Sequence, residues 1–375
     1  MRLLIYTLII GFSLGVSSKA NADIRFNGFA SVKAGTTLGS GETLYKYEDE
    51  LSWRHETLVG LQFGADLQQD LSVTAQLVGR GSESYETNLE WAYISYRITD
   101  NLKFNAGRIR TPFYKYTDFI DVGYAYDWVR VPQSVYNLNF TNLDGVSLYY
   151  TSQLMGFDST LHLTAGSNDG RPEIAGRKVD GKVRGGYGII WELNRDFFTV
   201  RLAHLGGELT ASDPELNGFT EMLRGIGYAS LADDLLLDDS HSDFNGLAVT
   251  LDKYDWVLVS ELTNVTFENS FVPEQTGFYV SLGHRMESFT PYISYEKRDD
   301  SAKREIYADV PQTAPFYSDL AGLIDSLAVD REAWSLGMRY DFHSSAAFKV
   351  QLTHSDNKIT NEQNQLLTFG IDLVF

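Results

Sequence analysis

The last ten residues of the chain, LLTFGIDLVF (366–375), alternate between apolar and other side chains. Counting back from Phe375, every second residue is apolar, whereas Asp372, Gly370 and Thr368 lie between them. Successive side chains of a β-strand point to opposite faces, so this pattern predicts a strand with one apolar and one polar face. Such a strand needs a neighbour for its backbone and an apolar environment for one of its faces.

The same alternation recurs along the chain after residue 23, in about sixteen segments of roughly 9–13 residues, close to the length of a tilted strand that crosses a bilayer. IRFNGFASVKA (24–34) opens the series, and WAYISYRI (91–98) is a clear example from its middle. After residue 23 no run of about 18 apolar residues occurs, so no transmembrane helix is expected there.

The connections between these segments alternate between short and long. The short connections are residues 66–70, 99–101, 193–196, 252–255, 286–288 and 341–345. The long connections are residues 35–51, 111–143, 168–180, 207–242 and 299–330, with shorter ones at 82–87, 268–275 and 357–363. Short periplasmic turns and long extracellular loops are typical of outer-membrane barrels. The sequence therefore predicts an all-β fold, a transmembrane antiparallel β-barrel of about 16 strands.

A barrel also explains how such strands enter a membrane, because every backbone polar group must find a partner there and only a closed sheet provides one. We expect the last strand to pair with residues 24–34, and an even strand count places both termini on the periplasmic side. The alternative is a soluble sandwich or propeller with ordinary core aromatics. A propeller would repeat a motif every ~40–50 residues, and no such repeat occurs; a single sandwich rarely needs so many long strands.

Residues 1–22 are predicted to be a cleaved signal peptide. Arg2 gives a basic start, residues 3–16 form an apolar run, and Ala-Asn-Ala (20–22) is a typical cleavage site. An N-terminal membrane anchor is the alternative, but the run is shorter than the ~20 residues that a spanning helix needs. The GFSLG motif (11–15) matches a hydrolase nucleophile elbow, but it lies in the segment to be removed. The barrel then occupies residues 23–375.

Composition excludes several functions. The net charge of −19 argues against a nucleic-acid partner, which needs a basic face. The chain has no cysteine, its 7 histidines lack metal-ligand spacing, and no nucleotide-binding loop or pair of catalytic carboxylates is evident. We therefore expect no cofactor, no metal site and no enzymatic activity.

Two other outer-membrane classes are alternatives. A hydrolase would need a Ser/His pair on one face, but Ser159 with His162 and His354 with Ser355 are spaced so that the two side chains of a strand point to opposite faces. A plugged receptor or adhesin would need a plug domain before the first strand, and the predicted mature sequence begins almost directly in that strand.

Signal peptide, alternating strands, alternating connections and terminal Phe together resemble the Gram-negative outer-membrane porins, over essentially the whole mature chain. The resemblance implies a cell outer-membrane location, a homotrimer, contact with outer-membrane lipid and lipopolysaccharide, and recognition of Phe375 by the barrel-assembly machinery. It also implies that residues 111–143 fold into the lumen as a constriction loop. The Pro-Glu-Phe-Gly-Gly loop signature of the general enteric porins is absent, and the second loop is only SESYET (82–87).

In such porins acidic residues of the constriction loop face arginines of the wall. The acidic candidates are Asp118, Asp121 and Asp127, and the basic candidates on the polar face of predicted strands are Arg80, Arg97, Arg184 and Arg201. Arg108, Arg110 and Lys115 lie near the junction of strand and loop. The alternative is that each is only a solvated charge of the wall or loop.

Three interpretations concern solutes. The loop aromatics, Phe113 to Trp128, can form a surface on which sugars stack, but packing against the wall explains them more simply. The acidic run DDLLLDDSHSD (233–243), with Asp299 and Asp300, can bridge cations to lipopolysaccharide, although a solvated outer loop is the simpler account. We expect a porin for passive diffusion of small hydrophilic solutes and ions, with a mild cation preference from the acidic excess. A substrate-selective porin for sugars or anions is the alternative.

Overall fold

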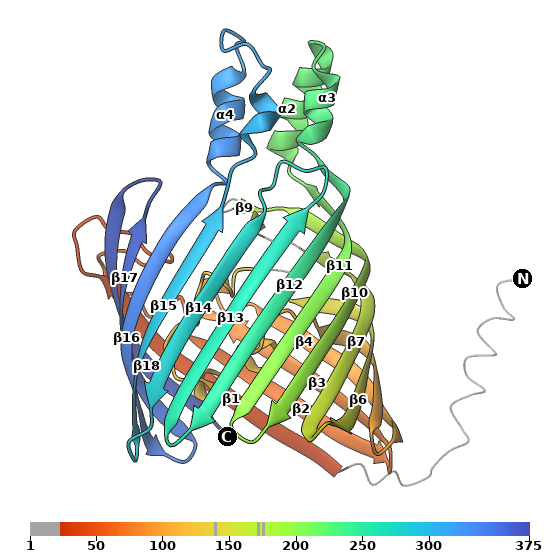
Figure 1. The fold of residues 1–375 in the computed structure, drawn as a ribbon, viewed down its shortest axis with the longest axis vertical. Coiled ribbons are helices and arrows are strands. Elements are labelled where there is room, and N and C mark those ends of the chain that lie inside the picture. The colour runs from red at the N-terminus through yellow and green to blue at the C-terminus, as the bar shows by residue number, and fades with distance from the viewer. Residues whose placement is uncertain (1–22, 139–140, 171–172, 175–176) are drawn as a thin grey trace, which may run out of the picture.

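The computed structural model describes residues 23–138, 141–170, 173–174 and 177–375. Sixteen strands form one closed antiparallel barrel, as predicted, and a separate hairpin of two short strands, β8 and β9, lies in one connection (Figure 1). The predicted signal peptide, residues 1–22, lies outside the described residues.

The barrel strands are β1 (Asp23–Thr37), β2 (Leu58–Gln68), β3 (Leu71–Arg80), β4 (Thr87–Thr99), β5 (Leu102–Arg110), β6 (Asn142–Leu154), β7 (Phe157–Gly170), β10 (Asp180–Arg195), β11 (Phe198–Ser212), β12 (Leu237–Lys253), β13 (Trp256–Phe267), β14 (Gln275–His284), β15 (Phe289–Asp300), β16 (Val329–His343), β17 (Ala346–Asn357) and β18 (Glu362–Val374). The hairpin consists of β8 (Glu173–Ile174) and β9 (Arg177–Lys178). The helices are η1 (Gly81–Glu83), η2 (Thr117–Phe119), η3 (Gly123–Ala125), α2 (Pro214–Gly225), α3 (Ala229–Asp234), η4 (Arg304–Tyr307) and α4 (Tyr317–Asp325).

The first and last strands close the ring. Their register pairs Val32 with Ile371, and beyond it Gly28 and Phe375 exchange both backbone hydrogen bonds, at 2.7 and 2.9 Å. A Cβ on Gly28 would lie 2.2 Å from the Phe375 ring, so only glycine lets the terminal aromatic lie flat against the first strand. The predicted pairing of the terminal strand with residues 24–34 is confirmed.

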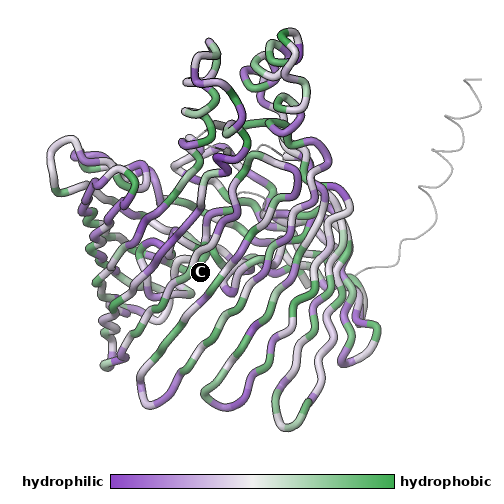
Figure 2. The backbone as a smooth tube through the Cα atoms, turned by 45° about the horizontal axis from the view of Figure 1, so that its top comes forward, coloured by the Kyte–Doolittle hydropathy of each residue, from purple (hydrophilic) through white to green (hydrophobic). Residues whose placement is uncertain are grey.

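The barrel is apolar outside and polar inside. On β16 the outward side chains Trp334 and Leu336 are 53% and 62% exposed, whereas Ser335 between them is 6% exposed. Glu261 on β13 points inward and is 2% exposed. Figure 2 shows the resulting alternation of hydrophilic and hydrophobic positions along the strands. Transfer of a Leu or Phe side chain from water to an apolar environment is favourable by ~1.5–3 kcal/mol. The outer surface therefore requires an apolar surrounding such as hydrocarbon.

Tight turns join the strands at one end of the barrel, and long loops join them at the other. In the tight turns the chain adopts positive φ at Asp196, Tyr254 and Glu287, where the direction of the strand reverses. Two long loops, residues 213–236 and 301–328, carry helices that stand above the opposite end (Figure 1). We call these two loops the helical tower. No helix among the described residues has the length and apolar character that crossing a bilayer requires.

The helical tower has its own apolar core, in which Leu223, Leu320 and Ile324 are fully buried. Helix α2 begins after Asp213, whose carboxylate accepts hydrogen bonds from the backbone N–H groups of Glu215 and Leu216, as an N-cap residue does. The expectation of a solvated outer loop at residues 233–243 holds for the exposed Asp233, Asp234, Asp238 and Asp239 but not for the leucines between them. Leu235 and Leu237 of DDLLLDD contribute to this core, and β12 begins at Leu237.

Candidate functional site

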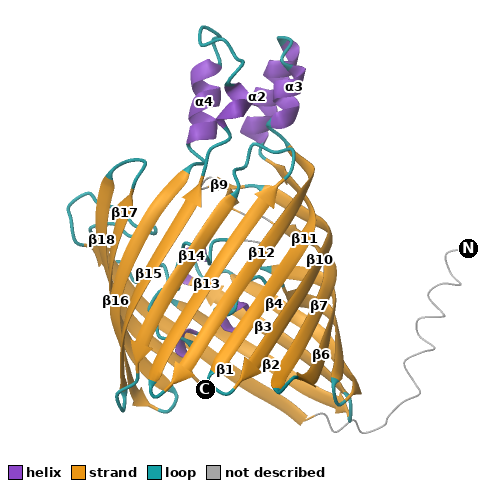
Figure 3. Cartoon of the chain, viewed as in Figure 1, coloured by secondary structure: helices purple, strands orange, loops and turns teal. Residues whose placement is uncertain are grey.

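Residues 111–138, which follow β5 along the chain, turn into the barrel, and we call them the inner loop. Figure 3 shows its short helical turns, η2 and η3, inside the ring of strands. Its contacts reach distant parts of the wall; the Trp128 indole N–H, for example, donates to the hydroxyl of Ser281 on β14 at 3.2 Å. The loop therefore crosses the lumen rather than covering its mouth.

One side of the inner loop is held by two lysines of the wall. The fully buried Lys349 of β17 forms an ion pair with Asp372 at 2.8 Å. It also donates to three backbone carbonyls of the loop at 2.5–3.2 Å, those of Gly123, Tyr126 and Trp128. Lys33 of β1 adds an ion pair with Asp372 at 3.2 Å and a hydrogen bond to the Val129 carbonyl at 2.8 Å. These buried charges are thus paired and hydrogen-bonded, as burial requires.

Two glycines allow the loop to approach the wall so closely. A Cβ on Gly123 in the loop would lie 2.0 Å from the Asp372 carboxylate. A Cβ on Gly277 in β14 would lie 2.0 Å from the Ser134 carbonyl of the loop. Because no side chain is tolerated at such distances, loop and wall fit only with glycine at both positions.

The other side of the loop is held by β11 and β13. Arg201 donates to the carbonyls of Phe113 and Pro112 at 2.9 and 2.5 Å. Glu261 accepts from the Lys115 backbone N–H at 2.9 Å, and also from the hydroxyls of Tyr279 and Tyr136. A charged wall residue therefore fixes loop backbone on each side of the lumen.

Three of the predicted site residues meet in one cluster. Asp121 of the inner loop lies 2.8 Å from Arg80 and 2.7 Å from Arg110, and Glu90 of β4 lies 2.5 Å from Arg80. Burial alone would raise the pKa of Asp121, but Arg110 and Arg80 together hold it below its usual value. Two cations face two carboxylates, so this cluster is locally neutral and ties the loop to β3 and β5.

The remaining loop candidates are spread over the lumen. Asp118 is exposed, and no cation of the described residues lies within 4.0 Å of it. Asp127 lies 3.8 Å from Arg339, beside a cavity of about 370 Å³ at the tight-turn side of the loop. Lys115 is half-buried, with its ammonium 5.7 Å from the centroid of the Tyr116 ring. Arg97 is exposed near the tight-turn end of β4.

Two predicted lumenal arginines lie on the outward face instead, which corrects the expectation. Arg184 was expected on the polar face, but β10 has a bulge between it and Tyr187. The bulge shifts the alternation by one, so Arg184 pairs with the outward Glu208 and lies 3.5 Å from Asp239, with its side chain 61% exposed. Arg108 pairs in register with Ala92, on the outward face of β4, and its carboxylate partner is Asp144 at 3.9 Å.

The aromatics of the inner loop pack against the wall, as the simpler interpretation predicted. Tyr114, Tyr126 and Trp128 are buried in one cluster with Phe244 and Tyr279 of the wall. The Trp128 and Tyr279 rings meet edge to face with their centroids 5.5 Å apart, a favoured aromatic geometry.

The most connected residues of this site, Lys349, Lys33 and Glu261, were missed from the sequence. A signal existed, because each is a charged residue on the polar face in the middle of a strand; Lys349, for example, lies between Phe348 and Val350. The partners of these residues could not be read from the sequence, because the contacts join residues far apart along the chain, such as Lys33 with Asp372 and Lys349 with Gly123.

Above the inner loop, toward the long loops, lies a cavity of about 900 Å³ that we call the vestibule. Six cationic side chains line it, those of Lys33, Lys46, Arg80, Arg130, Arg298 and Arg331. Two carboxylates, Glu56 and Glu296, line it as well. Within the described ranges, no group of three or more His, Cys, Asp or Glu residues is arranged to hold a metal ion.

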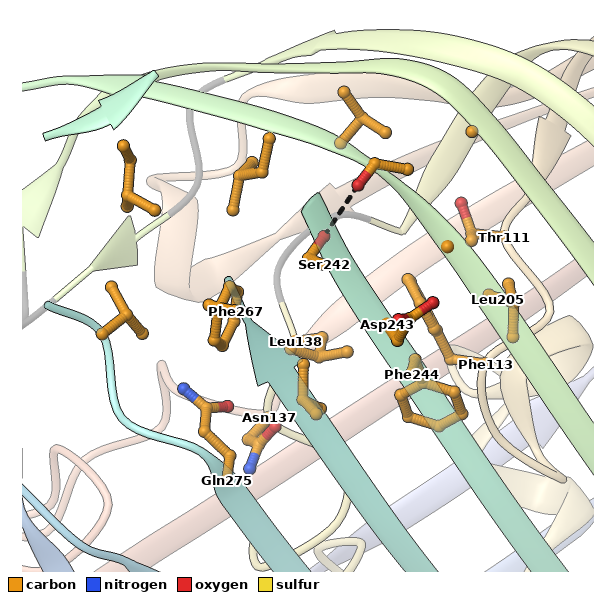
Figure 4. A pocket seen from close by; sticks show the side chains of 18 of the residues that line it. Thr111, Phe113, Asn137, Leu138, Leu205, Ser242, Asp243, Phe244, Phe267 and Gln275 are labelled. Atoms are coloured by element: carbon orange, nitrogen blue, oxygen red, sulfur yellow. Dashed lines mark hydrogen bonds between the residues drawn. The ribbon is translucent and has the colours of Figure 1, made fainter. Parts of the chain in front are cut away.

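A second, mostly apolar cavity of about 340 Å³ adjoins the vestibule, and we call it the apolar chamber. Figure 4 shows Phe113 and Leu138 of the inner loop together with Phe244 and Phe267 of the wall around it. Both cavities share Asn137, Arg298 and Val329 in their lining, so one opens beside the other.

No protein-family model and no curated protein matches the sequence. Solved structures do match the fold. The anion-selective porin from Comamonas acidovorans has a TM-score of 0.59 at 12% identity, over 94% of this chain and 100% of that one. OmpF of Salmonella typhi, in complex with daunomycin, gives 0.57 at 13% identity over 94% and 97%. The trimer form of OmpT from Vibrio cholerae gives 0.55 at 11% identity over 94% and 99%. At these identities the likeness establishes the fold, which is that of the Gram-negative porins.

Proposed function

We propose that this chain is an outer-membrane porin, a water-filled channel through which small hydrophilic solutes and ions diffuse passively, and not an enzyme. The inside-out distribution of side chains carries the proposal. An apolar outer belt fits a bilayer, and a lumen lined by charged and hydroxyl groups fits water and dissolved solutes.

The path past the inner loop runs along the wall opposite its anchors. The loop is bonded to β1, β3, β11 and β13–β17 and, among the described residues, to β5 only through its last residue, Arg110. On the side of β4 to β7, Asp118 and Lys103 are exposed, and the Lys103 ammonium lies 4.7 Å from the centroid of the lumenal Tyr149 ring. Asp118, Lys103 and Arg97 would therefore line the constriction, whereas Arg80, Arg110, Arg201 and Asp121 would position the loop.

A substrate-selective porin is the second candidate, and the vestibule favours its anion form over its sugar form. Overall charge suggests a cation preference. In the vestibule Lys33, Arg80 and Arg298 are paired with carboxylates. The local preference for anions therefore depends on Arg331, which has no carboxylate of the described residues within 4.0 Å. Since the field inside a narrow pore comes mainly from the charges that line it, we expect the vestibule to outweigh the charges of the outer loops.

Export through the predicted signal peptide, assembly by the barrel-assembly machinery through Phe375, and contact with lipid and lipopolysaccharide belong to the same proposal. A homotrimer is also proposed, and one structure with this fold, OmpT of Vibrio cholerae, is described in a trimer form.

Conductance of the purified protein in a planar lipid bilayer tests the proposal. A porin gives stepwise current increases as single barrels insert, and the reversal potential across a salt gradient gives its ion preference. A correctly folded barrel that inserts but carries no current would contradict the channel function.

A further inference from the structure

Two arginines of the lumen face each other directly. Arg298 on β15 and Arg331 on β16 are cross-strand partners in register, and both line the vestibule. Like charges directly opposite each other on neighbouring strands destabilise a sheet. A stable fold does not need this arrangement, so a ligand that uses both guanidinium groups is the natural reason for it.

The two arginines differ in how their charge is compensated. Arg298 donates to the buried carboxylate of Asp300 at 2.7 Å. Within the described part of the chain, no carboxylate lies within 4.0 Å of Arg331, and the centroid of the Tyr45 ring lies 6.0 Å from its guanidinium. Arg331 is half-buried and lines the vestibule. It therefore offers a planar, two-pronged donor of the kind that binds a carboxylate.

The apolar chamber begins beside these arginines. Arg298 belongs to the lining of both cavities, and so does Val329, two residues before Arg331 on the same face of β16. Away from Arg298 the chamber is lined mainly by aliphatic and aromatic side chains (Figure 4). A molecule that spans the boundary therefore meets a cation at one end and an apolar surface at the other.

The apolar chamber also adjoins a cavity of about 730 Å³ in the helical tower. Leu237, Ser326 and Leu327 line both of them. Three neighbouring cavities thus lead from the outer helices through apolar surroundings to the basic vestibule. A solute with an apolar body can follow this route and end with its charge at the arginines.

We propose that the chamber and the vestibule together form a binding site for amphipathic monocarboxylates, molecules with a carboxylate on a small aromatic or alkyl body. The carboxylate lies between Arg331 and Arg298, and the body occupies the apolar chamber. A combination of an apolar pocket with a few placed polar groups is typical of small-molecule sites. Inorganic anions would leave the apolar part of the site unused.

This inference rests on the proposed function and adds a solute class to it. A binding experiment tests the site independently of the channel function. Purified protein in detergent is titrated with benzoate, acetate and benzyl alcohol by equilibrium dialysis. Benzoate carries both features, acetate only the charge, and benzyl alcohol only the apolar body. We expect saturable benzoate binding at least tenfold tighter than that of either fragment.

Two variants test the two halves of the site. Arg331→Gln removes the uncompensated charge and should weaken benzoate binding about tenfold or more, since a hydrogen bond to a charged group is worth roughly 1.5–3 kcal/mol. Leu327→Gln places an amide in the apolar lining and should weaken benzoate binding while leaving acetate binding unchanged. Arg195→Gln, at the tight-turn end of β10, is the matched control and should bind as the parent does.

Equal binding of benzoate and acetate, or full benzoate affinity in Arg331→Gln, would overturn the site. Block of the bilayer current by benzoate shows whether the site lies on the permeation path. Binding without any channel current would overturn the porin function and leave the site standing. Channel current without saturable benzoate binding would overturn the binding site and leave the porin function standing.

Discussion

Lys349 and Arg331 are both basic residues of the lumenal wall, but the surroundings of their charges are opposite. Lys349 is fully buried and has one carboxylate and three backbone carbonyls around its ammonium. Arg331 is half-buried, faces another arginine across the sheet, and borders a cavity. A cation whose bonds are all made within the chain holds structure together, whereas a cation left with spare donors beside a cavity is available to a solute. We call residues that hold the inner loop in this way tethers. The number of bonds that a cation makes within the chain distinguishes a tether from a residue that can bind a solute better than its charge or its position does.

Lys349→Met should have the largest effect of the variants below. It leaves three loop carbonyls and part of the Asp372 charge without a partner, which we expect to cost about 3 kcal/mol. The urea midpoint of unfolding in detergent should fall, and a protease should cleave the inner loop faster. Lys182→Met, at an exposed position of β10, is the control. An unchanged midpoint and an intact loop would show that Lys349 is not a tether.

Gly123→Ala should destabilise the same contact by a smaller amount. The new Cβ would lie 2.0 Å from the Asp372 carboxylate, and moving the loop aside should cost about 1–3 kcal/mol. Gly218→Ala in α2, where a Cβ would meet no atom within 4 Å, should leave stability unchanged or raise it. The two variants are compared by thermal unfolding in detergent. Equal stability of both would mean that the loop does not fit the wall as closely as described.

Asp118→Asn should change selectivity without changing stability. Its carboxylate is exposed in the lumen and forms no ion pair within 4.0 Å among the described residues, so its removal leaves one negative charge fewer at the constriction. The reversal potential in a salt gradient should shift toward anions, while the unfolding midpoint stays constant. Asp234→Asn in the helical tower is the charge-matched control. A shift of equal size in the control would place Asp118 away from the path.

Arg108→Ala should have the smallest effect on selectivity. Its register with Ala92 places it on the outward face, beside Asp144 and away from the lumen. The sequence pattern alone had suggested a lumenal arginine, whose loss shifts selectivity toward cations. Reversal potentials of the variant and the parent should coincide, and a cation shift would restore the original assignment.

The fold could be predicted because alternation along a strand depends only on sequence. The sixteen segments, the closure of residues 24–34 on the terminal strand and the inward direction of Asp372 all follow from period two. The same rule fails where a bulge shifts it, which is why Arg184 was misplaced. The helical tower was missed because its leucines lie within an acidic run, and their burial depends on a second loop almost a hundred residues later.

The candidate site was harder to predict, because the role of each charged side chain depends on the partner that it meets in the fold. Arg80, Arg110 and Asp121 were each named from the sequence, but that they neutralise one another follows only from the way the inner loop folds. Lys349 and Arg331 have similar sequence signals, since each is a cation on the polar face of a strand. Only the positions of the carbonyls and carboxylates around them give the two residues different roles.

The closure between Gly28 and Phe375 also sets the order of events during biosynthesis. The two strands that meet there are the first and the last of the sixteen barrel strands, so the ring cannot close until β18 has been synthesised. Until then both edges carry unpaired backbone groups, which attract other strands and promote aggregation. A product that stops early keeps these edges permanently. The position of the seam therefore distinguishes finished chains from unfinished ones.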